Sequence, residues 1–138
     1  MPITTAICNS FKREILEGVH DAADVYMIAL YTSAATLDKA TTAYSATNEA
    51  AGAGYTAGGV IMVGYTTALA TDTAYIDWTT DPSWASATIT ARGALIYNVT
   101  QGNRAVATYD FGADITSTNG TFTATLPAPG ATAVVRVA

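Results

Sequence analysis

The segment Ala87–Phe111 places the strongest constraint on the fold, because it has the composition of two long strands folded back on each other. Both halves are rich in β-branched and aromatic residues, which favour a pleated sheet. Gln101, Gly102 and Asn103 separate the halves, and Gly and Asn tolerate the positive φ of a tight turn. Gly93 interrupts the first half, which is typical of a β-bulge or a close backbone approach. We therefore expect this hairpin at the centre of an antiparallel sheet.

Shorter apolar runs on both sides of the hairpin predict further strands. The nearly continuous run Asp24–Tyr31 is typical of a strand buried on both faces. The other expected strands are Val60–Thr66, Thr73–Trp78, Thr121–Leu126 and Thr132–Ala138. Gly112–Gly120 is expected to be a polar loop. This pattern predicts a mainly β fold, an antiparallel β-sandwich or barrel of about seven strands within residues 24–138.

One α-helix is expected at the N-terminus, within residues 1–20. Its apolar residues recur at four-residue spacing: Ile7, Phe11 and Ile15. Its charged residues fall largely on the opposite face: Lys12, Arg13, Glu14 and Glu17. Thr4 or Thr5 is suited to cap the start of the helix, and Gly18 stands where its last turn should end. Such a helix either covers the sheet or docks onto a neighbouring subunit.

Residues 32–48 are too weakly hydrophobic for a core element, and residues 32–59 together are expected to form an extended surface excursion. Long segments of this kind are usually functional or disordered, so contacts with a partner are expected here. Residues 50–59 are rich in glycine and predict a flexible turn. A phosphate loop is disfavoured, since the P-loop Lys-Ser/Thr pair is missing and a strand follows where a helix would be needed.

The composition favours a protein that works in contact with other chains. The 138 residues are 50% hydrophobic and only 12% charged. Depletion of charge is typical of interface cores, and the alternative is a monomer solvated by Thr and Ser. The length fits one domain covering residues 1–138.

The charge distribution argues against nucleic acid and membrane partners. The formal net charge is −5, and the six basic residues are scattered along the chain. Binding to a phosphate backbone or an anionic membrane needs clustered cations. The apolar runs are too short to span a bilayer, and no signal-peptide pattern opens the sequence. We therefore expect synthesis in a cytoplasm without a cleaved signal.

No catalytic, cofactor-binding or metal-binding set is expected, so the chain is predicted not to be an enzyme. Cys8 and His20 are the only residues of their types. A Cys8–His20 nucleophile pair is disfavoured because Cys8 lies on the apolar face of the expected helix. A structural Ca²⁺ held by Asp72, Asp77 and Asp81 is a further alternative, although isolated aspartates are mostly turn formers.

Aromatic residues supply the remaining candidate contacts. Trp78 and Trp84 either fill the core or form a platform that stacks on sugars or on a partner protein. Tyr44 and Tyr55 lie in the excursion, where large amphipathic rings suit an interface. The candidate interface residues are Ile7, Phe11, Ile15, Tyr44, Tyr55, Trp78 and Trp84.

Five stretches together resemble small structural proteins of tailed bacteriophages. They are TTAICNSFKREILEGVHDAADVYMIALYTSAATL, TAYSATNEAAGAGYTAGG, ATITARGALIYN, NRAVATYDFGAD and AVVRVA. They are spread along the sequence, so the resemblance extends over nearly the whole chain. The resemblance implies a virion component without a catalytic signature. Proteins of this type and size commonly act as capsid decoration (cement) proteins.

The resemblance also implies a location and partners. The protein would be made in the host cytoplasm and seated on the capsid exterior. Its partners would be the major capsid protein and further copies of itself, with a trimer suited to three-fold positions. A tail, neck or baseplate protein is the alternative within the virion, and a carbohydrate-binding module using Trp78 or Trp84 is the alternative outside it.

Overall fold

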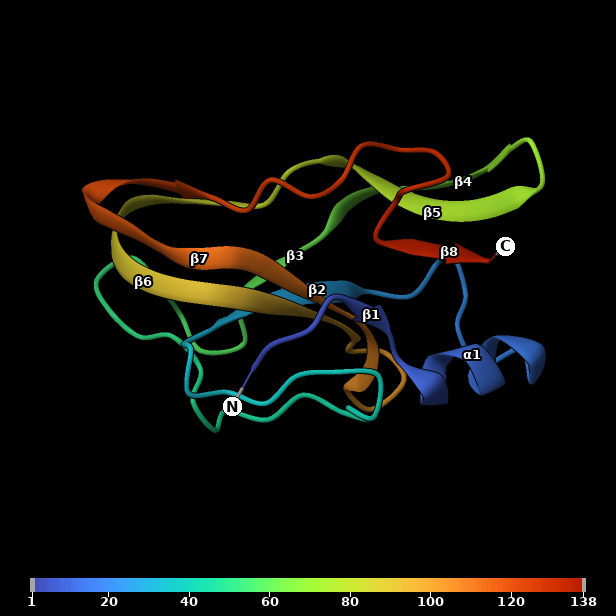
Figure 1. Cartoon of the computed structure of the whole chain (residues 1–138), viewed down its shortest axis with the longest axis horizontal. Helices are drawn as coiled ribbons and strands as arrows, with labels where there is room; N and C mark the ends of the chain where they lie inside the picture. Colours follow the sequence, from blue (N-terminus) through green and yellow to red (C-terminus); the bar gives the residue numbers. More distant parts are fainter. Residues whose placement is uncertain (1, 138) are drawn as a thin grey trace.

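The computed structural model describes residues 2–137, which form one helix and eight strands (Figure 1). In chain order these are β1 (Ala6–Ile7), α1 (Asn9–Leu16), β2 (Tyr26–Tyr31), β3 (Val60–Ile61), β4 (Val63–Ala70), β5 (Thr73–Thr80), β6 (Ser83–Asn98), β7 (Arg104–Thr123) and β8 (Val135–Val137). One sheet has the order β1-β7-β6-β2-β3 and the other the order β4-β5-β8. All strand pairs are antiparallel, and the layers resemble a sandwich and do not close into a barrel. The predicted mainly β class is confirmed.

The predicted central hairpin is β6 and β7, which pair along their length around a turn that includes Gly102 and Asn103 at φ 76° and 64°. Both strands are longer than expected, and Gly112–Gly120 belongs to β7 instead of a loop. Polar cross-strand contacts support this extension. The Thr90 and Thr116 hydroxyls lie 3.0 Å apart, and the Ser117 hydroxyl donates to a main-chain carbonyl of β6.

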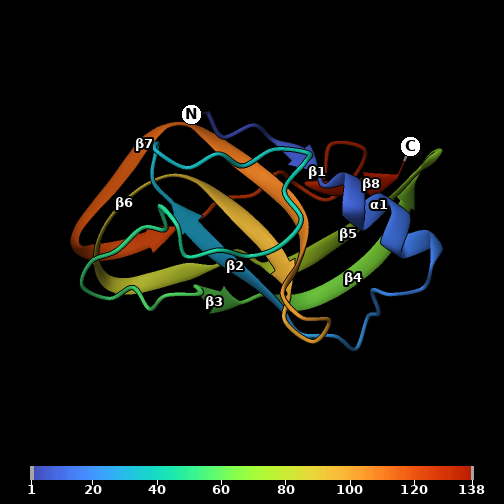
Figure 2. The same cartoon turned by 90° about the horizontal axis from the view of Figure 1, so that it is seen from below.

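The hairpin curves strongly, so its far end reaches the second layer (Figures 1 and 2). Four register shifts interrupt the β6–β7 pairing, and bulges of this kind bend the bulged strand. At the largest shift, Ala91 faces Ile115 while Gly93 faces Asp110, so residues 111–114 of β7 oppose Arg92 alone. The bulge predicted at Gly93 is therefore confirmed. We call residues 111–115 the acidic bulge.

The core lies on both faces of the five-stranded sheet, between the two layers and beneath residues 32–59, and is built mainly from β2, β6 and β7. Its fully buried side chains include Ile28, Leu30, Ile89, Leu95, Ile96 and Val106. An aromatic contact joins the layers, since the Tyr26 ring of β2 lies 5.5 Å from Tyr65 of β4 and 5.6 Å from Trp78 of β5. Burial of this apolar surface is the main force that holds the sheets together.

The helix is shorter than predicted, because the chain before it is a strand. Ala6 and Ile7 pair with Thr108 and Ala107 of β7, so Ile7 lies outside the helix. The predicted Thr4 or Thr5 cap is wrong: Cys8 precedes the first helical residue and makes no side-chain cap. Residues 6–7 are extended because their backbone groups pair with the edge of β7. This pairing stabilises the strand here, although the apolar residues recur at helical spacing. Gly18, at φ 74°, ends the helical segment as expected.

Residues 32–59 contain no helix or extended strand and cover one face of the five-stranded sheet, as Figure 2 shows. Ala35 and Leu37 are buried, so part of the excursion contributes to the core after all. A Cβ atom on Gly59 would lie 1.7 Å from the Ile28 carbonyl oxygen, and one on Gly52 would lie 2.0 Å from that of Thr88. The glycines therefore serve close packing on β2 and β6, instead of the flexible turn that was expected.

Replacing Gly93 with Ala tests the close approach at the bulge. The new Cβ would lie 2.5 Å from the Tyr109 carbonyl oxygen and 2.8 Å from the Ile3 side chain. Overpacking of this kind should lower the free energy of unfolding by about 1–3 kcal/mol in urea denaturation. Gly120→Ala is the matched control, because its Cβ would meet nothing closer than 3.6 Å. Equal stabilities for the two variants would contradict the proposed close approach.

Candidate interaction surfaces

The seven candidate interface residues divide into a buried and a half-buried group. Phe11, Trp78 and Trp84 are 1%, 4% and 4% exposed, so they fill the core and present no surface to a partner. For the tryptophans, the structure supports the core alternative, and neither ring offers a face to a sugar. The other four are partly exposed: Ile7, Ile15, Tyr44 and Tyr55. Their role in an interface stays a prediction.

The three-stranded sheet extends beyond the core at the end where β4 turns into β5 (Figure 1). Leu69, Ala74 and Val137 lie opposite one another on its three strands and therefore share one face. By alternation, Trp78 and Val135 lie on the same face, and both are buried. Leu69 and Val137 are 72% and 53% exposed, so the inner face of this sheet is uncovered at its end.

The uncovered apolar surface continues onto α1. Leu16 is 88% exposed, and with Ile15 and Val137 it lines a hollow of about 350 Å³. We call Leu16, Leu69, Ala74 and Val137 the apolar overhang. Contiguous exposed apolar surfaces of this kind are typical of interaction sites.

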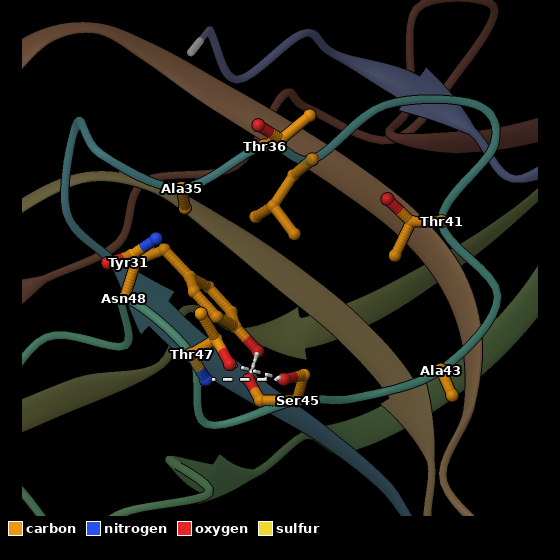
Figure 3. A pocket seen from close by; sticks show the side chains of 9 residues that line it. Tyr31, Ala35, Thr36, Thr41, Ala43, Ser45, Thr47 and Asn48 are labelled. Atoms are coloured by element: carbon orange, nitrogen blue, oxygen red, sulfur yellow. Dashed lines mark hydrogen bonds between the residues drawn. The ribbon is translucent and has the colours of Figure 1, made fainter.

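The surface excursion encloses a second hollow, of about 250 Å³, beside the end of β2 (Figure 3). The Tyr31 hydroxyl donates to the Ser45 carbonyl oxygen at 2.6 Å, and the Ser45 hydroxyl lies 3.2 Å from that of Thr47. The lining residues carry no charge: Tyr31, Ala35, Thr36, Leu37, Thr41, Ala43, Ser45, Thr47 and Asn48. The hollow therefore lacks an ionisable acid or base suited to catalysis, apart from the engaged Tyr31 hydroxyl.

The carboxylate of Glu49 joins three parts of the second half of the excursion. Glu49 accepts hydrogen bonds from the hydroxyls of Tyr44, at 2.6 Å, and Tyr55, at 2.5 Å, and from the Gly58 N–H at 2.7 Å. The Tyr55 hydroxyl also accepts the Leu30 N–H of β2. Burial, and then the hydrogen bond to Glu49, raise the pKa of Tyr55, which keeps its donor proton in place. Sequence reasoning missed Glu49, although it is the one acidic residue between the two tyrosines.

Replacing Glu49 with Ala should loosen the excursion. Three donors would lose a charged acceptor, and hydrogen bonds to charged groups contribute about 1.5–3 kcal/mol each at most. We expect faster amide exchange and faster proteolysis within residues 44–58, with the β6–β7 hairpin still protected. Glu17→Ala is the control, because that carboxylate is exposed and contacts only Arg13. If amide exchange and proteolysis of residues 44–58 are unchanged in Glu49→Ala, Glu49 does not hold this part of the excursion in place.

A buried polar cluster joins α1 to the end of the central hairpin. Glu14 is only 3% exposed, which corrects the prediction that it lies on the exposed face of the helix. Its carboxylate binds Arg104 Nη1 at 2.7 Å and His20 Nε2 at 2.9 Å. Asn98 Nδ2 lies 3.0 Å from His20 Nδ1. The amide nitrogen can only donate and a carboxylate can only accept, so His20 lies between a donor at Nδ1 and an acceptor at Nε2.

These contacts leave neither His20 nor Cys8 available for nucleophilic chemistry. Both ring nitrogens of His20 are engaged, and Phe11 packs against the ring at 4.7 Å. Cys8 is fully buried. Burial, reinforced by the Asp38 and Glu14 carboxylates, raises the pKa of the Cys8 thiol to about 12. A protonated, inaccessible thiol is a poor nucleophile.

Metal ligands do not converge in the part of the chain that the structure describes. Within residues 2–137, no group of three or more His, Cys, Asp or Glu side chains is arranged to hold a metal ion. Asp72, Asp77 and Asp81 therefore do not form the cation site considered from their spacing. No helix in this range is long and apolar enough to cross a membrane.

Comparison with known proteins finds no matching family model, no matching curated protein and no matching solved structure. The surfaces and clusters described above are therefore the structural basis for assigning a function.

The Glu14 cluster predicts a pH dependence of stability. Burial alone would raise the pKa of Glu14, but the hydrogen bonds from His20 and Arg104 outweigh it and hold that pKa below its ordinary value. A carboxyl with a lowered folded-state pKa stabilises the fold above its unfolded pKa, and this contribution is lost as the pH falls through the folded value. Stability should therefore decline below about pH 4.

Glu14→Gln removes this titration. We expect a shallower decline in acid and a loss of about 1–3 kcal/mol at pH 7, because Arg104 loses its charged acceptor. Urea denaturation between pH 3 and 7 measures both effects. Glu17→Gln, on the exposed side of the same helix, should follow the parent protein throughout. If the free energy of unfolding falls as steeply with decreasing pH in Glu14→Gln as in the parent protein, Glu14 is not the cause of the decline in acid.

Proposed function

We propose that this chain is a structural protein without enzymatic activity, which acts by adhering to other protein subunits. The observation that carries the proposal is the apolar overhang. Leu16 and Leu69 are among the most exposed large apolar side chains of the molecule, and Leu69 lies on a sheet face that is buried elsewhere. Exposing such a face to water is unfavourable, and a partner that covers it recovers the burial free energy.

We propose further that the chain is a capsid decoration protein of a tailed bacteriophage, bound to the major capsid protein on the outside of the shell. The sequence resemblance to phage structural proteins supports this role. The low charge fraction and the net charge of −5 also suit a surface that contacts protein and stays away from packaged DNA. A protein that binds only the assembled shell stabilises it by mass action.

A tail, neck or baseplate position is the second candidate, since the overhang would serve adhesion there equally well. Copy number separates the two positions. A decoration protein covers the whole shell in many copies, whereas a neck or baseplate protein is confined to one vertex in few copies.

The test uses phage particles that encode this chain, stripped of it and then incubated with the purified protein. The protein should rebind, and should raise the temperature at which the particles release DNA. The double variant L69D/V137D should lose at least a factor of ten in affinity, which is about 1.4 kcal/mol. Ala68→Asp is the control, because Ala68 is exposed on the opposite face of the same strand.

Two outcomes would end the proposal. Particles that never contain the protein would exclude a virion role, and stripped particles with unchanged heat stability would exclude cementing. Rebinding of L69D/V137D at the affinity of Ala68→Asp would show that the overhang is not the adhesive surface.

A further inference from the structure

The basic residues of this acidic chain are divided into two sets. Three of them form ion pairs with carboxylates: Arg13, Arg92 and Arg104. The other three form no ion pair within residues 2–137, and all of them line one hollow of about 370 Å³: Lys12, Lys39 and Arg136. Carboxylate side chains outnumber basic side chains by 11 to 6, so each basic residue could have an ion-pair partner. Three basic residues without such a partner nevertheless gather around one hollow. We call this hollow the cationic hollow.

Residues of β1, α1 and β8 contribute to the lining of the cationic hollow. β1 and β8 are each a terminal strand of one sheet, and Figure 2 shows both of them near α1. Asp38 is the nearest acidic side chain in sequence to Lys39, and its carboxylate accepts the Ala40 N–H at 2.8 Å. Lys12 and Arg136 also line the hollow that contains Leu16. A cationic centre therefore adjoins the apolar overhang.

This arrangement selects a particular ligand chemistry. Three cations suit a carboxylate, and the adjoining overhang suits an apolar side chain next to it. A nucleic acid or an anionic membrane is disfavoured, because the net charge of −5 would repel an extended polyanion. The matching ligand is an exposed protein segment with an aspartate or glutamate beside a large apolar residue.

The acidic bulge of β7 is such a segment. Ile115 is 42% exposed, and the exposed Asp114 beside it makes no hydrogen bond or ion pair within the described residues. The other carboxylates that adjoin an exposed large apolar residue are already engaged: Glu17 with Arg13, and Asp24 with Asn98. Residues 111–114 of the bulge oppose only Arg92 of β6, and only Ile115 keeps a paired partner, Ala91, so most of the bulge is not needed for pairing within the chain.

We propose that the cationic hollow of one copy binds the acidic bulge of a second copy, with Asp114 among Lys12, Lys39 and Arg136, and Ile115 against the apolar overhang. The two surfaces are different patches of the molecule, so the contact is head-to-tail and builds a ring or an open row. The inference deepens the proposed function and rests on it for the protein nature of the partner. The contact area is small, so binding is weak in solution and is reinforced when copies share a surface.

Analytical ultracentrifugation tests the contact. The mass of the parent protein should rise with concentration and fall back when the salt concentration is raised. The hollow variant K12E/K39E and the bulge variant Asp114→Lys should each stay monomeric. An equimolar mixture should form dimers and nothing larger, because the hollow variant still has a bulge and the bulge variant still has a hollow.

Two matched variants control for charge alone. Arg13→Glu changes a cation on α1 outside the hollow, and Asp72→Lys changes an exposed carboxylate in the β4–β5 turn. Both should associate like the parent protein. Urea denaturation should show that all four variants are folded, since each change is at an exposed position.

Three results would overturn the proposal: a parent protein that is monomeric up to its solubility limit, association that survives in K12E/K39E or Asp114→Lys, or a mixture that stays monomeric. The proposed adhesive function is tested separately by rebinding to stripped particles. If the protein rebinds to stripped particles but does not self-associate, the contact between copies is excluded and the proposed adhesive function is retained.

Discussion

The backbone pairing between β6 and β7 is the interaction on which the rest of the structure depends. These two strands belong to the five-stranded sheet at the turn end and curve toward the second layer at the other end. β1 and β2 pair with their outer edges, and α1 is tied to their turn through Glu14 and Arg104. Because β1, β2 and α1 are all attached to this hairpin, a change in its register would displace the helix and the cationic hollow that β1 and α1 help to line.

The few charged side chains are used in two different ways. Glu14 and Glu49 are engaged within the chain and hold the helix and the surface excursion in place. Each accepts hydrogen bonds from at least two donors, which compensates the loss of water around a carboxylate. The charges left on the surface are sparse. On a surface with few charges, the apolar overhang and the cationic hollow differ most from their surroundings. Both are suited to contact with protein.

The molecule carries two different surface patches, and this difference bears on how copies could assemble. The overhang and the hollow lie where the β4–β5 hairpin, α1 and the open sheet edges come together. The acidic bulge lies on the central hairpin, where β7 carries residues that β6 does not match. A molecule with complementary patches that differ from each other assembles in one direction, whereas a self-complementary patch would stop at a dimer.

The sequence by itself determined the features that depend on neighbouring residues. Gly102 and Asn103 specified the hairpin turn, the apolar run before Tyr31 specified β2, and Gly18 specified where the helix ends, because turn chemistry and hydrophobic periodicity act over a few residues. Only the tertiary structure decided that Ile7 joins a strand, that Gly112–Gly120 continues β7, and that Glu14 is buried. Each of these depends on a partner 24 to 100 residues away in the chain. The convergence of Lys12, Lys39 and Arg136 depends in the same way on strand pairing that no local pattern encodes.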